Sequence, residues 1–120
     1  MKRKSFLFVL RRPPYEGAWP RESLDMILAA AAFDQTVRLL FLDEGVRRLQ
    51  AGQRPESSGL EAVAPMFQVL PMYDVEEVWV EEESLRERGM SPASLILPAR
   101  LLPRARVAEF LSGQDFLVAC

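Results

Sequence analysis

Short apolar runs that alternate with segments of helical periodicity are the feature of this sequence that most restricts its fold. The run Ser5–Leu10 is almost entirely apolar, which is typical of a strand buried on both faces of a sheet. Apolar residues at helical spacing follow from Pro20, and proline is favoured at the first position of a helix. The next apolar run is Thr36–Leu42. Strand, helix and strand in this order predict a βαβ unit with parallel strands.

The rest of the chain continues this alternation. We expect a helix from Pro65 onward and a short charged helix over Glu81–Gly89. A last helix is expected over Pro103–Leu111, with Val107, Phe110 and Leu111 facing inward. The further strands are expected at Val75–Val80, Ser94–Leu97 and Asp115–Ala119. Right-handed crossovers then give an α/β three-layer sandwich with a mainly parallel five-stranded sheet. A length of 120 residues fits one domain, residues 1–120.

Composition excludes several classes of protein. Cys120 is the one cysteine and histidine is absent, so an intramolecular disulfide is impossible and the commonest metal ligand and general base are missing. A formal net charge of −2 argues against a dedicated nucleic-acid binder. No stretch approaches the ~20 apolar residues of a membrane helix, and no signal peptide is evident, so a cytoplasmic protein is expected. The basic clusters are interpreted as solvated surface: Lys2–Lys4, Arg11–Arg12, Arg47–Arg48, and Arg100 with Arg104 and Arg106.

Residues capable of chemistry fall where the predicted strands end. Ligands of open α/β sheets bind beyond the carboxyl ends of the strands, which selects the loops that begin at Arg11, Asp43, Glu81 and Pro98. None of these loops has a glycine-rich phosphate-binding motif. Arg11 and Arg12 could hold an anion, but a solvated pair is the favoured interpretation.

The carboxylates at this edge allow two interpretations. Asp43 and Glu44 could bind a divalent cation or act as acid and base. Without histidine or a third carboxylate nearby in sequence, a turn and helix cap is favoured. Glu81, Glu82 and Glu83 repel one another, so we expect them to be exposed and to cap a helix, with a functional role left open.

Cys120 is the only strong nucleophile of the chain. A negative charge beside its thiol would disfavour the thiolate, so an inert residue is expected. The sequence therefore predicts no catalytic, cofactor-binding or metal-ligating residue, and no cofactor.

Seven short stretches, taken together, carry a resemblance. They are Phe6–Val9, Arg21–Asp25, Asp43–Val46, Gly52–Pro55, Tyr73–Val75, Trp79–Val80 and Ser84–Gly89. Their order, their spacing and the total length resemble the TusC/DsrF branch of the DsrE-like sulfur-relay proteins from end to end.

The resemblance implies a DsrE/flavodoxin-like fold and a heterohexamer with two copies each of three related subunits, TusB, TusC and TusD. Such a complex passes persulfide sulfur along a relay that ends in 2-thiouridine at the wobble position of tRNA. Carriers of the family place a cysteine in the loop after the third strand, where this chain has Glu81–Glu83. Because a persulfide needs a thiol, no sulfur-carrying role is expected here.

The expected function is therefore that of a non-catalytic subunit, which packs against TusB-like and TusD-like partners without direct contact with tRNA. Apolar residues that could supply the interface are Trp19, Phe33, Met66, Met72, Tyr73 and Trp79, although a core role is favoured for Trp79. Two alternatives stay open. One is a DsrF-type subunit of a dissimilatory sulfur-oxidation complex. The other is a small stand-alone enzyme that uses the carboxylates Asp43, Glu44 and Glu81.

Overall fold

The computed structural model describes residues 4–13, 19–51 and 64–120. Within these residues, five strands form one sheet in the order β4-β3-β2-β1-β5, and all neighbouring strands are parallel. The strands are β1 (Ser5–Leu10), β2 (Thr36–Phe41), β3 (Glu77–Glu81), β4 (Arg100–Leu102) and β5 (Phe116–Ala119). The predicted α/β fold with a five-stranded parallel sheet is confirmed.

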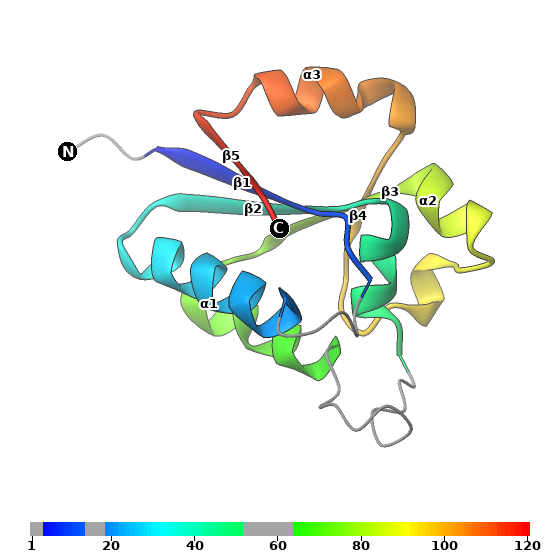
Figure 1. Cartoon of the computed structure of the whole chain (residues 1–120), viewed down its shortest axis with the longest axis horizontal. Coiled ribbons are helices and arrows are strands. Elements are labelled where there is room, and N and C mark those ends of the chain that lie inside the picture. The colour runs from blue at the N-terminus through cyan, green and yellow to red at the C-terminus, as the bar shows by residue number, and fades with distance from the viewer. Residues whose placement is uncertain (1–3, 14–18, 52–63) are drawn as a thin grey trace.

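Helices lie on both faces of this sheet, which gives the predicted three layers (Figure 1). On one face lie α1 (Trp19–Ala32) and the 3-10 helix η3 (Ala64–Tyr73), and on the other lies α3 (Val107–Ser112). The shorter helical segments are η1 (Asp43–Leu49) after β2, α2 (Glu82–Glu87) after β3, η4 (Pro92–Ser94), and η5 (Arg104–Arg106) before α3.

Each face of the sheet has its own apolar core. The larger one joins Phe8, Leu39 and Phe41 of the sheet to Ile27 of α1 and Phe67 of η3. The rings of Phe41 and Phe67 meet edge to face, with their centres 5.5 Å apart. On the opposite face the predicted inward residues of α3 cover a smaller core, whose members are Leu7, Leu40, Leu42 and Leu102 with Val107, Phe110 and Leu111. Each fully buried side chain of this size contributes about 1.5–3 kcal/mol.

The fourth strand is the one that the sequence misplaced. Residues 92–94 form η4, closed by a capping box between Ser91 and Ser94, and Leu95 makes only an isolated antiparallel bridge to Gln50. The strand itself is β4, which begins at Arg100. Residues 95–97 pack against the larger core without pairing in the sheet, so their apolar character reflects burial and not strand structure.

The segment before β3 also differs from the prediction. The helix expected from Pro65 is a 3-10 helix, and it contains Pro71, which lacks the N–H that a regular helix would use. It ends at Tyr73. The next residue, Asp74, has a left-handed φ of 62°, and the N–H of Val75 donates back to the carbonyl of Leu70 at 3.1 Å. Val75 is thereby tied to the helix, which explains why β3 begins at Glu77.

Candidate functional site

The carboxyl ends of the parallel strands bring five chemically capable residues to one edge of the sheet. Arg11 follows β1, Asp43 lies just beyond β2, Glu81 ends β3, Arg104 follows β4, and Cys120 follows β5. The loops predicted at Arg11, Asp43 and Glu81 do lie at this edge. The prediction for Pro98 is wrong, because that residue precedes β4, and the loop after β4 supplies Arg104 instead.

Glu81 is buried, which corrects the expectation that the three adjacent glutamates are exposed. Glu81 is 5% exposed. Its carboxylate accepts hydrogen bonds from the hydroxyl of Ser84 and from Nη2 of Arg104, the latter at 2.9 Å. Glu82 and Glu83 are half-buried at the start of α2. A buried carboxylate is costly unless it is paired and hydrogen-bonded, and both partners are present here.

Arg104 connects the loop after β4 to α2. Its Nη1 and Nη2 donate to the two carboxylate oxygens of Glu87 at 2.9 and 3.0 Å, and its backbone N–H donates to Glu83 at 2.9 Å. Glu87 and then Glu81 raise the pKa of Arg104, while Arg104 lowers the pKa of both Glu83 and Glu87. The position after β3 is therefore closed by a network of ion pairs between the loop and α2.

The carboxylates of Asp43 and Glu44 are also engaged by arginines. Nε and Nη2 of Arg11 lie 2.8 and 2.7 Å from Oδ2 of Asp43. Glu44 accepts from Nε of Arg47 at 2.9 Å and of Arg88 at 3.0 Å, and these bonds, with Arg88 the larger cause, lower the pKa of Glu44. Among the residues that the structure describes, no group of three or more His, Cys, Asp or Glu could hold a metal ion.

Backbone contacts hold the loops of this edge close together. The N–H of Asp43 donates to the hydroxyl of Ser84 at 2.8 Å, which links the loop after β2 to α2. At Gly45 a Cβ atom would lie 1.8 Å from the carbonyl oxygen of Leu10, so η1 packs directly on the end of β1. Only glycine fits this approach. The favoured interpretation of Asp43 as a helix cap is wrong in detail, because η1 has no side-chain cap and the Asp43 carboxylate pairs with Arg11.

Cys120 occupies a separate buried cluster. The side chain of Ser23 in α1 interacts with its thiol, and the hydroxyl of Ser23 accepts a hydrogen bond from Nη1 of Arg48 at 3.2 Å. Arg48 is 0% exposed and its Nε donates to the carbonyl of Arg12 at 2.9 Å, so its expected place on the solvated surface is wrong. Burial raises the pKa of Cys120, although Ser23 and Arg48 oppose the shift. A buried thiol with a raised pKa is a weak nucleophile.

Cys120 also lies far from Glu81. The strands β2 and β1 stand between β3 and β5, so the ends of β3 and β5 are three strand spacings apart, or about 14 Å. The one thiol of the chain is therefore not at the edge position that follows β3.

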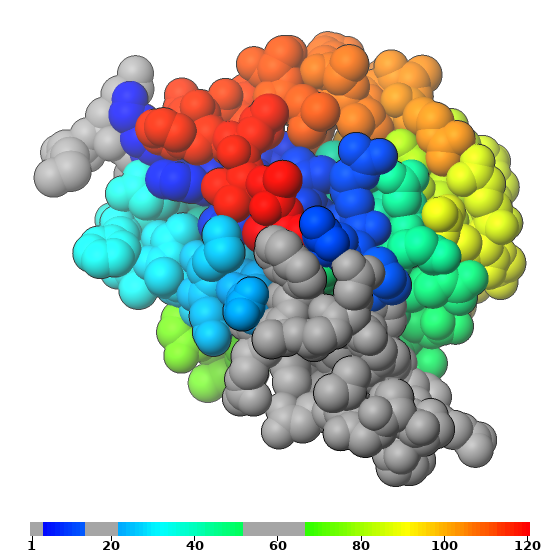
Figure 2. Space-filling model, viewed as in Figure 1, coloured from blue at the N-terminus to red at the C-terminus, as the bar shows by residue number. Residues whose placement is uncertain are grey.

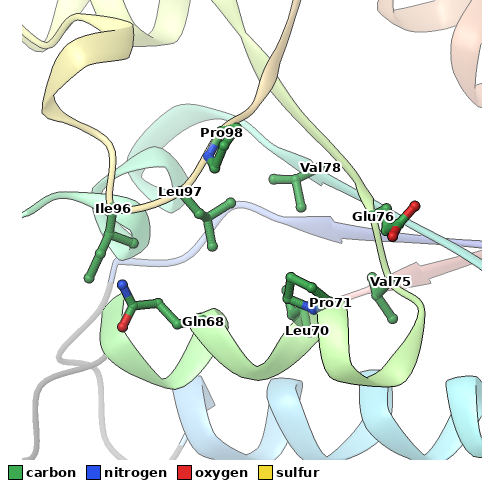
Figure 3. Close-up of a pocket in the computed structure, with 9 residues that line it drawn as sticks. All are labelled: Gln68, Leu70, Pro71, Val75, Glu76, Val78, Ile96, Leu97 and Pro98. Atoms are coloured by element: carbon green, nitrogen blue, oxygen red, sulfur yellow. The ribbon is translucent and has the colours of Figure 1, made fainter.

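A hollow of about 410 Å³ lies near the amino end of β3, away from the charged edge (Figure 3). In Figure 3, Gln68, Leu70 and Pro71 of η3 line one side and Ile96, Leu97 and Pro98 the other. Val75, Glu76 and Val78 complete the lining, so its polar side chains are Gln68 and Glu76. It holds no nucleophile and no charged cluster.

The residues proposed for an interface divide into two groups. Phe33 is 76% and Met72 is 82% exposed, and Tyr73 is also exposed. Trp79 is partly buried against the smaller core, where its ring centre lies 5.0 Å from that of Phe110, as favoured from the sequence. The side chains of Trp19 and Met66 lie outside the described residues, as do Lys2, Arg3 and the loop Gly52–Pro55.

No helix in the described part of the chain is long and apolar enough to cross a membrane.

Sequence comparison finds full-length relatives. The "Protein TusC homolog" of Pseudomonas aeruginosa is 36% identical over 115 residues, 96% of this chain and 97% of that protein. The "Intracellular sulfur oxidation protein DsrF" of Allochromatium vinosum is 37% identical over 126 residues, 93% of each chain.

Solved structures share the fold. The ychN protein of E. coli superposes with a TM-score of 0.81 at 19% identity, over 98% of this chain and 99% of that one. The protein MTH1491 of Methanobacterium thermoautotrophicum gives a TM-score of 0.66 at 14% identity, over 99% and 100%. The model of the DsrE/DsrF-like family matches residues 4–119. This chain belongs to the DsrE/DsrF-like family.

Proposed function

We propose that this chain is a non-catalytic, cytoplasmic subunit of a TusBCD-type sulfur-relay complex that supports 2-thiolation of the tRNA wobble uridine. Its partners would be a TusB-like and a TusD-like subunit in a heterohexamer. The observation that carries the proposal is the closed position after β3, where the buried Glu81 accepts from Ser84 and Arg104. Relatives named TusC support the sulfur-relay assignment.

The chemistry of persulfide transfer supports a role without sulfur. A relay carrier needs a thiolate that attacks an incoming persulfide, and a carboxylate cannot take its place. The negative charges of Glu81, Glu83 and Glu87 would also disfavour a thiolate beside them. Cys120 is buried and its pKa is raised. The sulfur would therefore travel on a partner, while this subunit shapes the surroundings of the partner's site.

Co-expression with TusB-like and TusD-like subunits of the same genome tests the proposal. We expect one complex of all three chains on size exclusion, and we expect restored tRNA thiolation when the chain is expressed with them in a strain that lacks the complex. A chain that stays outside the complex would contradict the proposal. A Glu81→Gln variant serves as a control, because it keeps an acceptor for Ser84 and should still support thiolation.

A DsrF-type subunit of a sulfur-oxidation complex is a second candidate, since DsrF of A. vinosum is 37% identical to this chain and the TusC homolog of P. aeruginosa is 36% identical. The two roles differ in phenotype. Deletion of the gene should abolish 2-thiouridine in the first case. In the second it should abolish growth on reduced sulfur and leave 2-thiouridine intact.

A further inference from the structure

The hollow near the amino end of β3 has its two polar side chains at opposite ends. In Figure 3, Gln68 of η3 lies at one end and Glu76 at the other, with Leu70, Val78 and Leu97 between them. Its volume of about 410 Å³ falls within the range of roughly 300–1,000 Å³ that is typical of ligand pockets. The hollow therefore combines apolar walls with one charged end.

The topology of the sheet leaves this space open. β4 pairs with β3 only from Trp79 onward, where Trp79 lies opposite Arg100, so no residue of β4 stands beside Val78. Residues 96–98 pass this point outside the sheet and form a wall of the hollow. Pro71 and Pro98 lie on facing walls (Figure 3). Because proline has a fixed φ, both walls keep their shape without a ligand.

Both polar ends of the hollow are available to a ligand. Glu76 and Gln68 are exposed, and neither side chain makes a hydrogen bond or an ion pair within the part of the chain that the structure describes. The lining contains no lysine or arginine. The carboxylate of Glu76 is thus a negative charge that nothing in the hollow neutralises.

The arginines nearest to Glu76 in the sheet are directed to the opposite face. Arg38 and Arg100 pair with Glu77, at 2.8 and 3.6 Å. Successive side chains of a strand point to opposite faces, and Val78 belongs to the larger core while Trp79 belongs to the smaller one. Glu77 shares the face of Trp79, so its two arginines lie away from the hollow.

Apolar surface continues past the hollow along the chain. Pro71 is followed by Met72 and Tyr73, which are both exposed. Figure 2 shows the light green atoms of η3 at the surface, beside the blue and cyan atoms of α1. An exposed apolar surface next to a pocket is typical of a site that a protein partner covers.

The chemistry of the lining selects the group that enters. Apolar walls fit a hydrocarbon stem, the carboxylate of Glu76 fits a cation, and the amide of Gln68 can both donate to and accept from a peptide group. A basic side chain carries all three. We propose that the hollow binds a lysine or arginine side chain of a protein partner, with its cation on Glu76 and its peptide group on Gln68. The inference does not depend on the proposed function, because it is tested on this chain alone.

NMR titration with Nα-acetyl-lysine methylamide and its arginine counterpart tests the site. We expect saturable shifts of the methyl signals of Ile96, Leu97 and Val78, with a dissociation constant in the millimolar range, as for a ligand of this size. Glu76→Gln should weaken the binding of both probes about threefold to fivefold, the effect of an exposed ion pair. Absence of saturable shifts with both probes would overturn the proposal.

Matched controls separate the charge from the apolar walls. Nα-acetyl-norleucine methylamide has a hydrocarbon side chain and no cation, so Glu76→Gln should leave its binding unchanged. Glu109→Gln changes an exposed glutamate of α3, on the other face of the sheet, and should leave all three probes unaffected. If Glu76→Gln and Glu109→Gln weaken the lysine probe equally, or if Glu76→Gln weakens the norleucine probe as much, the cation does not bind at Glu76.

n-Butylammonium distinguishes a protein side chain from a free amine. It carries the stem and the cation of lysine without a peptide group, so we expect it to bind several-fold more weakly than the lysine probe. Gln68→Ala should remove this difference, and because Gln68 is exposed the variant should melt at the wild-type temperature. Equal affinity of the wild-type protein for both compounds would mean that a small amine is the occupant, and it would overturn the proposal.

Discussion

Replacement of Glu81 by alanine is the most direct test of the closed position after β3. The change removes the carboxylate that accepts from Ser84 and Arg104. A hydrogen bond to a charged group contributes about 1.5–3 kcal/mol. The contribution of the Arg104–Glu81 bond is lower here, because the Arg104 side chain is 46% exposed and keeps its bonds to Glu87. The alanine also removes the cost of burying a carboxylate, which offsets part of the loss. We expect a loss of about 1–2 kcal/mol in the free energy of unfolding.

Urea denaturation followed by circular dichroism measures this loss. With a slope near the low end of about 1–3 kcal/mol/M, the midpoint should fall by about 1 M. Glu81→Gln keeps an acceptor for Ser84 and Arg104 and should lose less than half as much. Glu109→Ala, on the exposed side of α3, is the control and should leave the midpoint in place. If Glu81→Ala unfolds at the same urea concentration as Glu109→Ala, the network does not hold the loops together.

Three further predictions concern the same edge. Gly45→Ala should lower the free energy of unfolding, measured by thermal denaturation, by about 3 kcal/mol, because its Cβ would overlap the carbonyl oxygen of Leu10. Gly113→Ala should be tolerated, because its Cβ would lie 3.7 Å from the nearest atom, the carbonyl oxygen of Phe110. Arg88 and Arg47 lower the pKa of Glu44, so the ionised Glu44 stabilises the fold above the unfolded pKa, and this stability is lost as the pH falls below about 4.5. In Glu44→Gln, the urea midpoint should therefore depend less on pH in this range. An unchanged dependence of the midpoint on pH would contradict the ion pair. Because burial raises its pKa, Cys120 should react with a disulfide reagent much more slowly in the native protein than in urea, and Cys120→Ser should leave tRNA thiolation intact. Equal rates in the two states would show an exposed thiol.

The sheet could largely be predicted from the sequence, because its central strands are buried on both faces and therefore appear as continuous apolar runs. β1 has the predicted bounds, and β2 ends one residue before the predicted Leu42. The same signal failed at residues 94–97, where apolar side chains reach the larger core from outside the sheet. Periodicity reports burial, and it cannot distinguish burial within a strand from burial beside one.

The candidate site could be predicted only in part. The rule for the carboxyl ends of strands placed Arg11, Asp43 and Glu81 correctly, since it depends on topology alone. The partner of Glu81 was missed because Arg104 is 23 residues away and follows a strand that was misplaced. The burial of Arg48 has no local signal either, because its acceptors, the carbonyl of Arg12 and the hydroxyl of Ser23, belong to distant segments.

The distribution of charge and apolar surface favours protein partners over a small charged substrate. At the carboxyl edge, the carboxylates of Asp43, Glu44 and Glu81 are each engaged by an arginine, so a charged ligand would have to displace an existing ion pair. Of the large apolar residues that stay exposed, Phe33 precedes β2 and Met72 precedes β3, so both lie toward the opposite, amino-end edge of the sheet. Apolar side chains left in water lose nothing when a partner covers them, and they gain roughly 25 cal/mol for each Å² buried. Substitutions at these apolar residues should therefore weaken assembly and leave the charged network and the fold intact.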